Sequence, residues 1–144
     1  MREIVWNEQN ISRLWKHYSK GDKRTYFGWH SGNSLIRYLQ RKGITFDNKK
    51  ILDFGCGNAY LYKWMKNLCN NFSYTGADTS AESIGYLKRK YGDEIEAIHI
   101  EDFPISCKEN SFDIILATEM VEHVDNKILD WDLKEWERLL RGGG

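Results

Sequence analysis

The sequence predicts an α/β fold in which helices flank a parallel β-sheet. After Lys50, short runs of apolar and β-branched residues alternate with longer segments of helical periodicity. A Gly-x-Gly turn joins the first of these runs to the segment that follows it. Alternation of short buried strands with helices is typical of a sheet whose strands are parallel. The 144 residues are enough for one domain with a modest core.

Residues 1–49 precede this alternation and are predicted to form a helical N-terminal segment. Apolar residues recur there at helical spacing, which predicts two helices between residues 10 and 42, the first with Ile11, Leu14, Trp15 and Tyr18 and the second with Leu35, Ile36 and Leu39. Residues 21–23 and 27–32 contain Gly and are predicted to be loops. The side chains Tyr26, Trp29 and His30 would form either a lid over a bound ligand or part of the core.

Residues 50–144 carry the predicted sheet. Strands are expected over residues 51–54, 74–78, 96–100 and 112–117. Helices are expected between and after them, one running from the glycine turn through Leu68, one over residues 80–91 and one over residues 126–140. Ligands of such sheets bind outside the carboxyl ends of the strands. We therefore expect functional residues just after each strand.

The sequence Asp53-Phe54-Gly55-Cys56-Gly57 lies at the end of the first predicted strand. Because Gly lacks a Cβ, the main chain at Gly55 and Gly57 can approach a ligand closely. A turn that binds a nicotinamide dinucleotide would have a third Gly at position 60, where this chain has Tyr60. The acidic Asp53 suits a cationic ligand, and the α-ammonium group of S-adenosylmethionine, or a water bound to it, would supply that charge.

Acidic residues also follow the second and third predicted strands. Asp78 lies 21 residues after Gly57, where a carboxylate can accept hydrogen bonds from both hydroxyls of a ribose. Its alternative role is to cap the next helix, although Thr79 and Ser80 are rival caps. Asp102 and Phe103 would bind the amino group of an adenine and stack beside its ring. The alternative for this pair is an ordinary turn.

Four segments of the chain together resemble the class I S-adenosylmethionine-dependent methyltransferases. Residues 51–57 are similar to the first motif of that family, and residues 75–80 to its ribose-binding second strand. Residues 110–115 resemble the entry to its fourth strand, and residues 139–144 the leucine-rich helix end before its fifth strand. The resemblance implies a Rossmann-like sheet of about four strands in the order 3-2-1-4, incomplete relative to the seven-stranded fold of the family.

The resemblance also implies the cofactor and the residues that hold it. S-adenosylmethionine would be bound, and S-adenosylhomocysteine would be the product. The residues predicted to bind the cofactor are Asp53, Gly55, Cys56, Gly57, Asp78, Thr79, Asp102, Phe103 and Thr118. The acceptor would be a small molecule methylated on oxygen or nitrogen.

The sequence Glu119-Met120-Val121-Glu122-His123 follows the fourth predicted strand. One helical turn would place Glu119, Glu122 and His123 on the same side. His123 would then be a general base, or the two carboxylates and the imidazole would hold Mg²⁺. The segment resembles small-molecule O-methyltransferases and also RNA 3′-terminal 2′-O-methyltransferases, in which it binds metal. The remaining interpretation is that Glu119 touches the cofactor while the other two orient the loop.

The charge, the cysteine count and the hydropathy of the chain give further expectations about its partners, its metal content and its location. The net charge is zero, so nucleic acid is a less favoured partner than a small molecule. Lys and Arg are in excess before residue 50, and this segment would either attract an anionic substrate or RNA or form a solvated helix face. Three cysteines without a Cys-x-x-Cys pair predict reduced thiols rather than a zinc site. No apolar run is long enough to span a membrane, and the cytoplasm is the expected location.

An exposed fourth strand would favour a homodimer that covers it. The alternatives to an enzyme of this family are a module that binds cofactor without turnover and a nicotinamide-dependent oxidoreductase.

Overall fold

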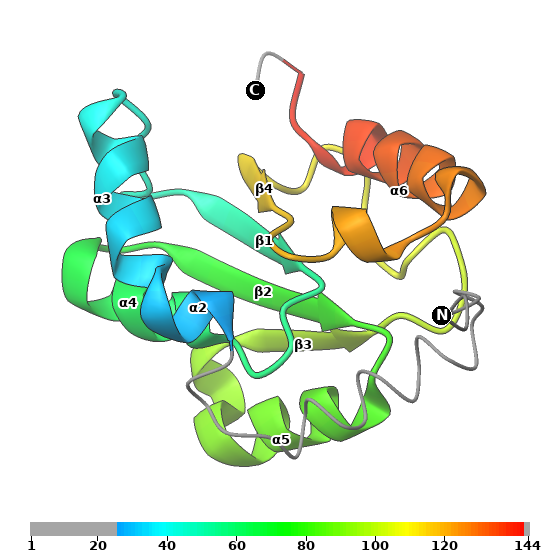
Figure 1. The fold of residues 1–144 in the computed structure, drawn as a ribbon, viewed down its shortest axis with the longest axis horizontal. Helices are drawn as coiled ribbons and strands as arrows, with labels where there is room; N and C mark the ends of the chain where they lie inside the picture. The colour runs from blue at the N-terminus through cyan, green and yellow to red at the C-terminus, as the bar shows by residue number, and fades with distance from the viewer. Residues whose placement is uncertain (1–25, 143–144) are drawn as a thin grey trace, which may run out of the picture.

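The computed structural model describes residues 26–142, with the side chain of His123 excepted. Its elements, in chain order, are α2 (Phe27–His30), α3 (Gly32–Arg41), β1 (Lys50–Phe54), α4 (Tyr60–Leu68), β2 (Ser73–Asp78), α5 (Ala81–Tyr91), η2 (Gly92–Glu94), β3 (Glu96–His99), β4 (Ile114–Leu116), η3 (Val121–His123) and α6 (Asn126–Leu139) (Figure 1). The predicted helix around residues 11–18 lies outside the described residues. Within residues 26–142, no helix is both long and apolar enough to cross a bilayer.

The four strands form one parallel sheet in the order β3-β2-β1-β4, which confirms the predicted topology. β1 lies between β2 and β4, with Asp53 opposite Gly76 on one side and Leu116 on the other. This register brings the ends of β1 and β2 together. The residues that follow the two strands are therefore neighbours at the carboxyl edge of the sheet.

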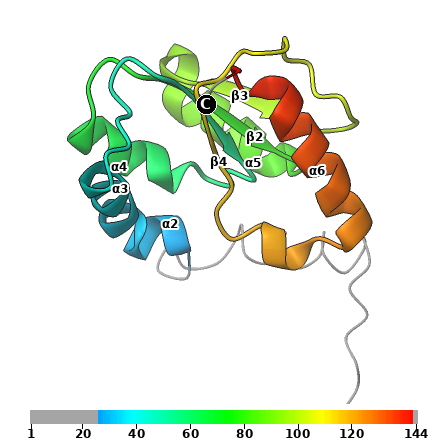
Figure 2. The same cartoon turned by 90° about the horizontal axis from the view of Figure 1, so that it is seen from above.

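Successive residues of β1 point to opposite faces of the sheet and so belong to two separate cores. Ile51 is fully buried among side chains of α3, α4 and α5. Leu52 is fully buried on the opposite face, in a cluster that includes Leu139 of α6. Figure 2 shows α3 and α4 on one side of the sheet and α6 on the other. The domain therefore has three layers, with α6 alone among the described helices supporting the second core.

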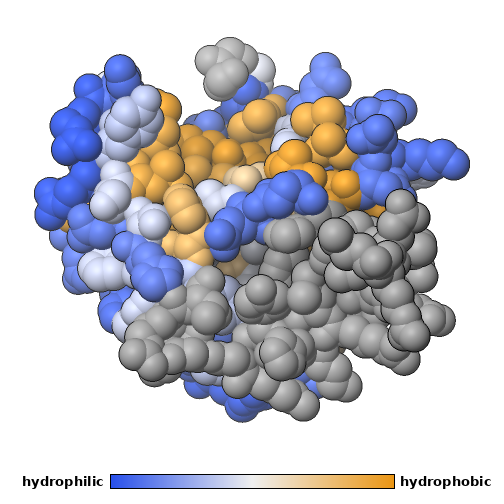
Figure 3. Space-filling model, in the orientation of Figure 1, coloured by the Kyte–Doolittle hydropathy of each residue, from blue (hydrophilic) through white to orange (hydrophobic). Residues whose placement is uncertain are grey.

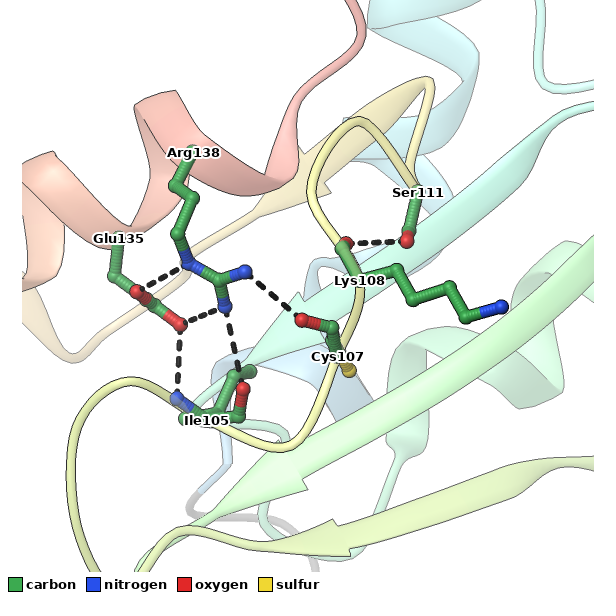
Figure 4. Close-up of polar contacts among 6 residues, drawn as sticks. All are labelled: Ile105, Cys107, Lys108, Ser111, Glu135 and Arg138. Carbon is green, nitrogen blue, oxygen red and sulfur yellow. Dashed lines mark hydrogen bonds and ion pairs between the residues drawn. The ribbon is translucent and has the colours of Figure 1, made fainter.

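Hydrogen bonds from a part-buried ion pair within α6, Glu135 with Arg138, fix this helix to the connection between β3 and β4 (Figure 4). Glu135 accepts hydrogen bonds from Arg138, at 2.6 Å, and from the backbone N–H of Ile105, at 2.9 Å. Arg138 also donates to the carbonyl groups of Cys107, at 2.8 Å, and Ile105. Hydrogen bonds between charged partners are stronger than neutral ones. They hold the helix at a defined position beside the ends of the strands.

The prediction of a loop over residues 27–32 is wrong, because this stretch forms α2 and the start of α3. Its glycines allow close packing against α4 rather than a turn. A Cβ on Gly32 would lie 2.6 Å from Cδ1 of Trp64, closer than side chains can approach. The indole N–H of Trp64 also donates to the carbonyl of Gly28 at 2.9 Å. The helical conformation of residues 27–32 is thus determined by contacts with residues distant in the sequence and not by the local composition.

β4 is an edge strand of the described sheet, as the sequence predicts. Apolar side chains gather between α3 and α6, over the part of the sheet that contains β4 (Figure 3). The chain after α6 begins to run beside this edge, because Leu140 forms a parallel bridge with Phe112. Arg141 strengthens the contact through an ion pair with Asp113 at 2.8 Å. A homodimer that covers β4 stays a prediction. The second copy of the chain would contact residues 140–141 beside this edge.

Replacement of Asp125 by Ala is expected to lower the free energy of unfolding by about 1 kcal/mol. Asp125 is the N-cap of α6, and its Oδ1 accepts the backbone N–H groups of Lys127 and Ile128 at 2.8 and 2.9 Å. Urea denaturation measures the loss. Asp130→Ala makes the same change at an exposed position inside the helix and is the control. Equal stability of the two variants would contradict the capping role.

Candidate functional site

A pocket of about 860 Å³ lies at the carboxyl edge of the sheet. Residues at or just after the end of every strand line it, with Phe54 from β1, Asp78 from β2, Ile100 after β3 and Thr118 after β4. The pocket extends to the start of α4 at Tyr60 on one side and to α6 on the other. Its place agrees with the general position of ligands in parallel α/β sheets.

The glycine turn forms the floor of this pocket. Gly55 and Gly57 have φ angles of 76° and 50°, in the left-handed region that favours glycine. A Cβ on Gly55 would lie 3.1 Å from Cβ of Met120, so the turn also packs tightly against the loop after β4. The N–H groups of Gly55 and Cys56 both donate to the carbonyl of Ala77, at 2.8 and 3.1 Å. The turn is therefore held by β2 on one side and by the loop after β4 on the other.

Asp78 braces the same turn from the end of β2. Its Oδ2 accepts the N–H of Gly57 at 2.8 Å, and its Oδ1 accepts the N–H of Ser80 at 2.8 Å. Burial raises the pKa of the Asp78 carboxyl, while these two N–H groups act against the rise. The cap of α5 is Ser80, whose hydroxyl accepts the N–H of Ser83. Each carboxylate oxygen of Asp78 thus keeps a lone pair that a ligand hydroxyl can use.

Asp53 lies beneath the pocket and is only 2% exposed. Burial raises the pKa of its carboxyl to about 7. The hydroxyl of Tyr74 acts against this rise by donating a hydrogen bond to the carboxylate, and the nearby charge of Asp78 adds to it. A carboxyl group with this pKa changes its charge near neutrality. A cation bound above it would favour the ionised form.

Glu119 is the one carboxylate of the Glu-x-x-Glu-His segment that lines the described pocket. Its Oε2 accepts the N–H of Phe27 at 3.1 Å, which links the loop after β4 to the start of α2. Glu119 has a φ of 55° and precedes η3, so the expectation that one helical turn aligns it with Glu122 and His123 is wrong. Glu122 is exposed and outside the described lining. The side chain of His123 lies outside the described part, and the catalytic roles of all three stay predictions.

Most residues predicted to bind the cofactor line this one pocket, namely Asp53, Gly55, Cys56, Gly57, Asp78, Thr79, Phe103 and Thr118. Asp102 is exposed and is not part of the described lining, where Glu101 is found instead. β3 ends at His99, one residue earlier than expected, and the His99 ring contacts both Glu101 and the carbonyl of Thr79. This contact directs residue 101 towards the end of β2.

Sequence reasoning missed the contribution of α6 to the pocket. Ile128 and Asp132 line it together with the exposed Trp131. Ile128 and Asp132 are four residues apart, so both lie on one face of the helix. That spacing could have indicated that Asp132 shares the buried face of the helix. An acidic residue in a helix is ordinarily expected to face solvent, and for that reason the signal was missed.

The described lining of the pocket has acidic side chains but no basic ones. It contains six carboxylates and no Lys, Arg or His, the six being Asp53, Asp78, Glu82, Glu101, Glu119 and Asp132. Such a pocket attracts cations and repels anions. Among the described side chains, no group of three His, Cys, Asp or Glu is close enough together to hold a metal ion.

Aromatic side chains border the pocket on the side of α2. The Tyr26 ring packs against Tyr60, with ring centroids 5.2 Å apart, and Trp29 meets the same ring at 5.5 Å. The ammonium of Lys63 lies 4.2 Å from the centroid of Trp29. Tyr26 lines the pocket, whereas His30 is exposed. These contacts attach the segment to α4, and its role as a lid stays a prediction.

Comparison with known proteins identifies the group of chains that this one resembles. The family described as "Methyltransferase domain" matches residues 51–144. A ubiquinone biosynthesis O-methyltransferase of Actinobacillus pleuropneumoniae serotype 7 is 33% identical over 102 residues, which cover 65% of this chain and 42% of that protein. The (S)-coclaurine N-methyltransferase of Papaver somniferum is 29% identical over 107 residues, 71% of this chain and 30% of its own.

Solved structures share the fold at low sequence identity. Phosphoethanolamine N-methyltransferase 1 of Haemonchus contortus, solved with phosphoethanolamine and S-adenosylhomocysteine, superposes with a TM-score of 0.71 at 16% identity. The match covers 94% of this chain and 30% of that one. The chain thus spans less than half the length of each of these three proteins.

Proposed function

This chain belongs to the class I S-adenosylmethionine-dependent methyltransferase family, and we propose that it binds S-adenosylmethionine and transfers its methyl group to oxygen or nitrogen of a small molecule. The acidic pocket carries this proposal. S-adenosylmethionine has a cationic sulfonium, whereas a nicotinamide dinucleotide has an anionic pyrophosphate. The lining offers six carboxylates and, among described residues, no basic side chain to balance a pyrophosphate.

We place the two ends of the cofactor in the pocket according to the carboxylates that lie at the ends of the strands. Asp53 lies below the turn of Gly55 and Gly57 and would face the methionine end with its positive charges. Asp78 would accept the ribose hydroxyls with the lone pairs that the loop N–H groups leave free. Phe103 would contact the adenine, with Glu101 as the neighbouring carboxylate in place of Asp102. Thr79 and Thr118 line the pocket beside these groups.

The reaction is a displacement in line with the carbon–sulfur bond. A lone pair on the acceptor oxygen or nitrogen forms a bond to the methyl carbon, and the electron pair of the broken bond stays on sulfur as the thioether of S-adenosylhomocysteine. The protein contributes mainly by aligning the two reactants. The acceptor loses its proton to a base, for which Glu119, Glu122 and His123 are the candidates. Mg²⁺ has no support from the described side chains and takes no part in this proposal.

The cytoplasm is the expected location, and a homodimer that covers β4 is the expected assembly, with light scattering as its test. A module that binds the cofactor without turnover is the alternative to an enzyme.

Calorimetric titration with S-adenosylmethionine, S-adenosylhomocysteine and NAD tests the cofactor assignment. We expect NAD to bind at least about tenfold more weakly than S-adenosylhomocysteine, since its pyrophosphate would face uncompensated carboxylates. Tighter binding of NAD would overturn the proposal. Transfer of a labelled methyl group to a set of phenols and amines then separates the enzyme from the binding module.

A further inference from the structure

Two buried carboxylates on α6 differ sharply in their surroundings. Glu135 is 6% exposed and is paired with Arg138 and with the N–H of Ile105. Asp132 lies about one turn earlier and is 2% exposed, yet its Oδ2 has no hydrogen-bond partner among the described residues. Burial without a partner raises the pKa of the Asp132 carboxyl to about 6, which still leaves it ionised at neutral pH. An ionised oxygen buried without a partner is costly to the folded state.

The side chain of Asp132 borders the pocket, although it is almost completely buried. It is part of the pocket lining, together with Val124, Ile128 and the exposed Trp131. Glu135, by contrast, is not part of the described lining. The hydrogen bonds that join Glu135 and Arg138 to the backbone of Ile105 and Cys107 hold α6 in place, so the position of Asp132 is defined by the fold (Figure 4).

We propose that Asp132 binds a protonated amine on the methyl acceptor. No described Lys, Arg or His lines the pocket, so the protein does not itself supply the missing positive charge there. An ammonium group would donate a charge-assisted hydrogen bond to Oδ2. Trp131 and Ile128 would contact the apolar part of the same molecule, and the indole face would also attract a cation. The acceptor class is thus an amine that carries an apolar or aromatic body.

This inference rests on the proposed function, because it assigns the acceptor to the α6 side of the pocket and the cofactor to the strand ends. The amine is a recognition group in its protonated form. It becomes the nucleophile only where the acceptor loses that proton first. The alternative is that a water molecule satisfies Asp132, with the nearby Trp136 as a second buried group whose N–H lacks a described partner.

Three probes with the same aromatic ring and different charge test the assignment: tyramine as the cation, 4-ethylphenol as the neutral molecule and 3-(4-hydroxyphenyl)propionate as the anion. Their binding is measured by ligand-observed NMR, with and without saturating S-adenosylhomocysteine. We expect tyramine to bind at least about tenfold more tightly than 4-ethylphenol, as one hydrogen bond to a charged group allows, and the anion to bind most weakly. A lack of preference for tyramine would overturn the inference.

Asp132→Asn should remove the preference for tyramine and change the affinity for S-adenosylhomocysteine by less than about twofold. The control is Asp130→Asn, which changes the charge of the same helix equally at an exposed position and should keep the preference. Asp132→Asn should also raise the melting temperature, because it removes an unpaired buried charge. A variant that unfolds, or that keeps the preference for the amine, would show that Asp132 is a structural residue or is bound to water.

The same measurements separate this inference from the proposed function. If S-adenosylhomocysteine fails to bind while tyramine binds in an Asp132-dependent manner, the cation site stands and the cofactor assignment falls. If S-adenosylhomocysteine binds while the three probes bind equally, the cofactor assignment stands and the acceptor class falls.

Discussion

At pH 8, the Asp53→Asn variant is expected to be more stable than the unsubstituted protein, by roughly 4 kcal/mol in the free energy of unfolding. Burial raises the pKa of Asp53 in the folded state to about 7, from its ordinary value of 3.8. Between these two values the folded state binds a proton that the unfolded chain does not. The stability that this proton confers is therefore present below pH 4 and is lost as the pH rises to 7. The amide of the variant does not ionise, so the variant does not lose this stability as the pH rises.

The measurement is urea denaturation of both proteins between pH 4.5 and pH 8. The difference in unfolding free energy should grow with pH and become constant above 7. The control is Asp93→Asn, which changes an exposed carboxylate in η2, just before β3. Its unfolding free energy should differ little from that of the unsubstituted protein at every pH. A difference between Asp53→Asn and the unsubstituted protein that is the same at all pH values would contradict the prediction.

Tyr74 provides a further check on the same carboxyl group. The hydroxyl of Tyr74 lowers the pKa of Asp53 by donating a hydrogen bond to its ionised form. Tyr74→Phe should therefore move the loss of stability to higher pH, with little change at pH 4.5. S-adenosylmethionine, through its positive charges, should have the opposite effect on the pKa and should release a proton when it binds near neutral pH.

The order of strands and helices could be predicted from the sequence because the strands are short and alternate with segments of helical periodicity. The first strand was expected at residues 51–54 and extends over Lys50–Phe54, and the last helix was expected at 126–140 and extends over Asn126–Leu139. Both elements have local determinants, an apolar run that ends in Gly in the first case and, as the structure shows, an N-cap at Asp125 in the second. Their prediction did not depend on knowing the tertiary contacts.

The loops around the pocket could not be predicted in the same way, because distant contacts set their conformation. Gly28 and Gly32 indicate a loop by composition, yet both pack against α4. Trp64 fills the space beside Gly32 and donates a hydrogen bond to the carbonyl of Gly28. Glu119 adopts a left-handed conformation and binds the N–H of Phe27, which is 92 residues away in sequence. No local pattern contains either contact.

Asp78→Ala is expected to weaken the binding of S-adenosylhomocysteine by about 100-fold. Two hydrogen bonds from ribose hydroxyls to an ionised carboxylate would be lost, each worth about 1.5 kcal/mol or more. The N–H groups of Gly57 and Ser80 would also lose their acceptors, which loosens the turn below the ligand. Calorimetric titration of the folded variant measures the loss. Glu82→Gln removes a negative charge from the same pocket without a bond to the turn and should change the affinity only a few fold.

A ligand that lacks one hydroxyl separates the two contributions of Asp78. The 2′-deoxy form of S-adenosylhomocysteine should bind the unsubstituted protein about tenfold more weakly than the parent compound. If Asp78 accepts the ribose hydroxyls, this difference should nearly vanish in Asp78→Ala, because the partner of the hydroxyl is already absent. If Asp78 only braces the glycine turn, the two losses should add. Additive losses would assign Asp78 to the architecture of the turn, and the ribose would then have to be bound by another group at the end of β2.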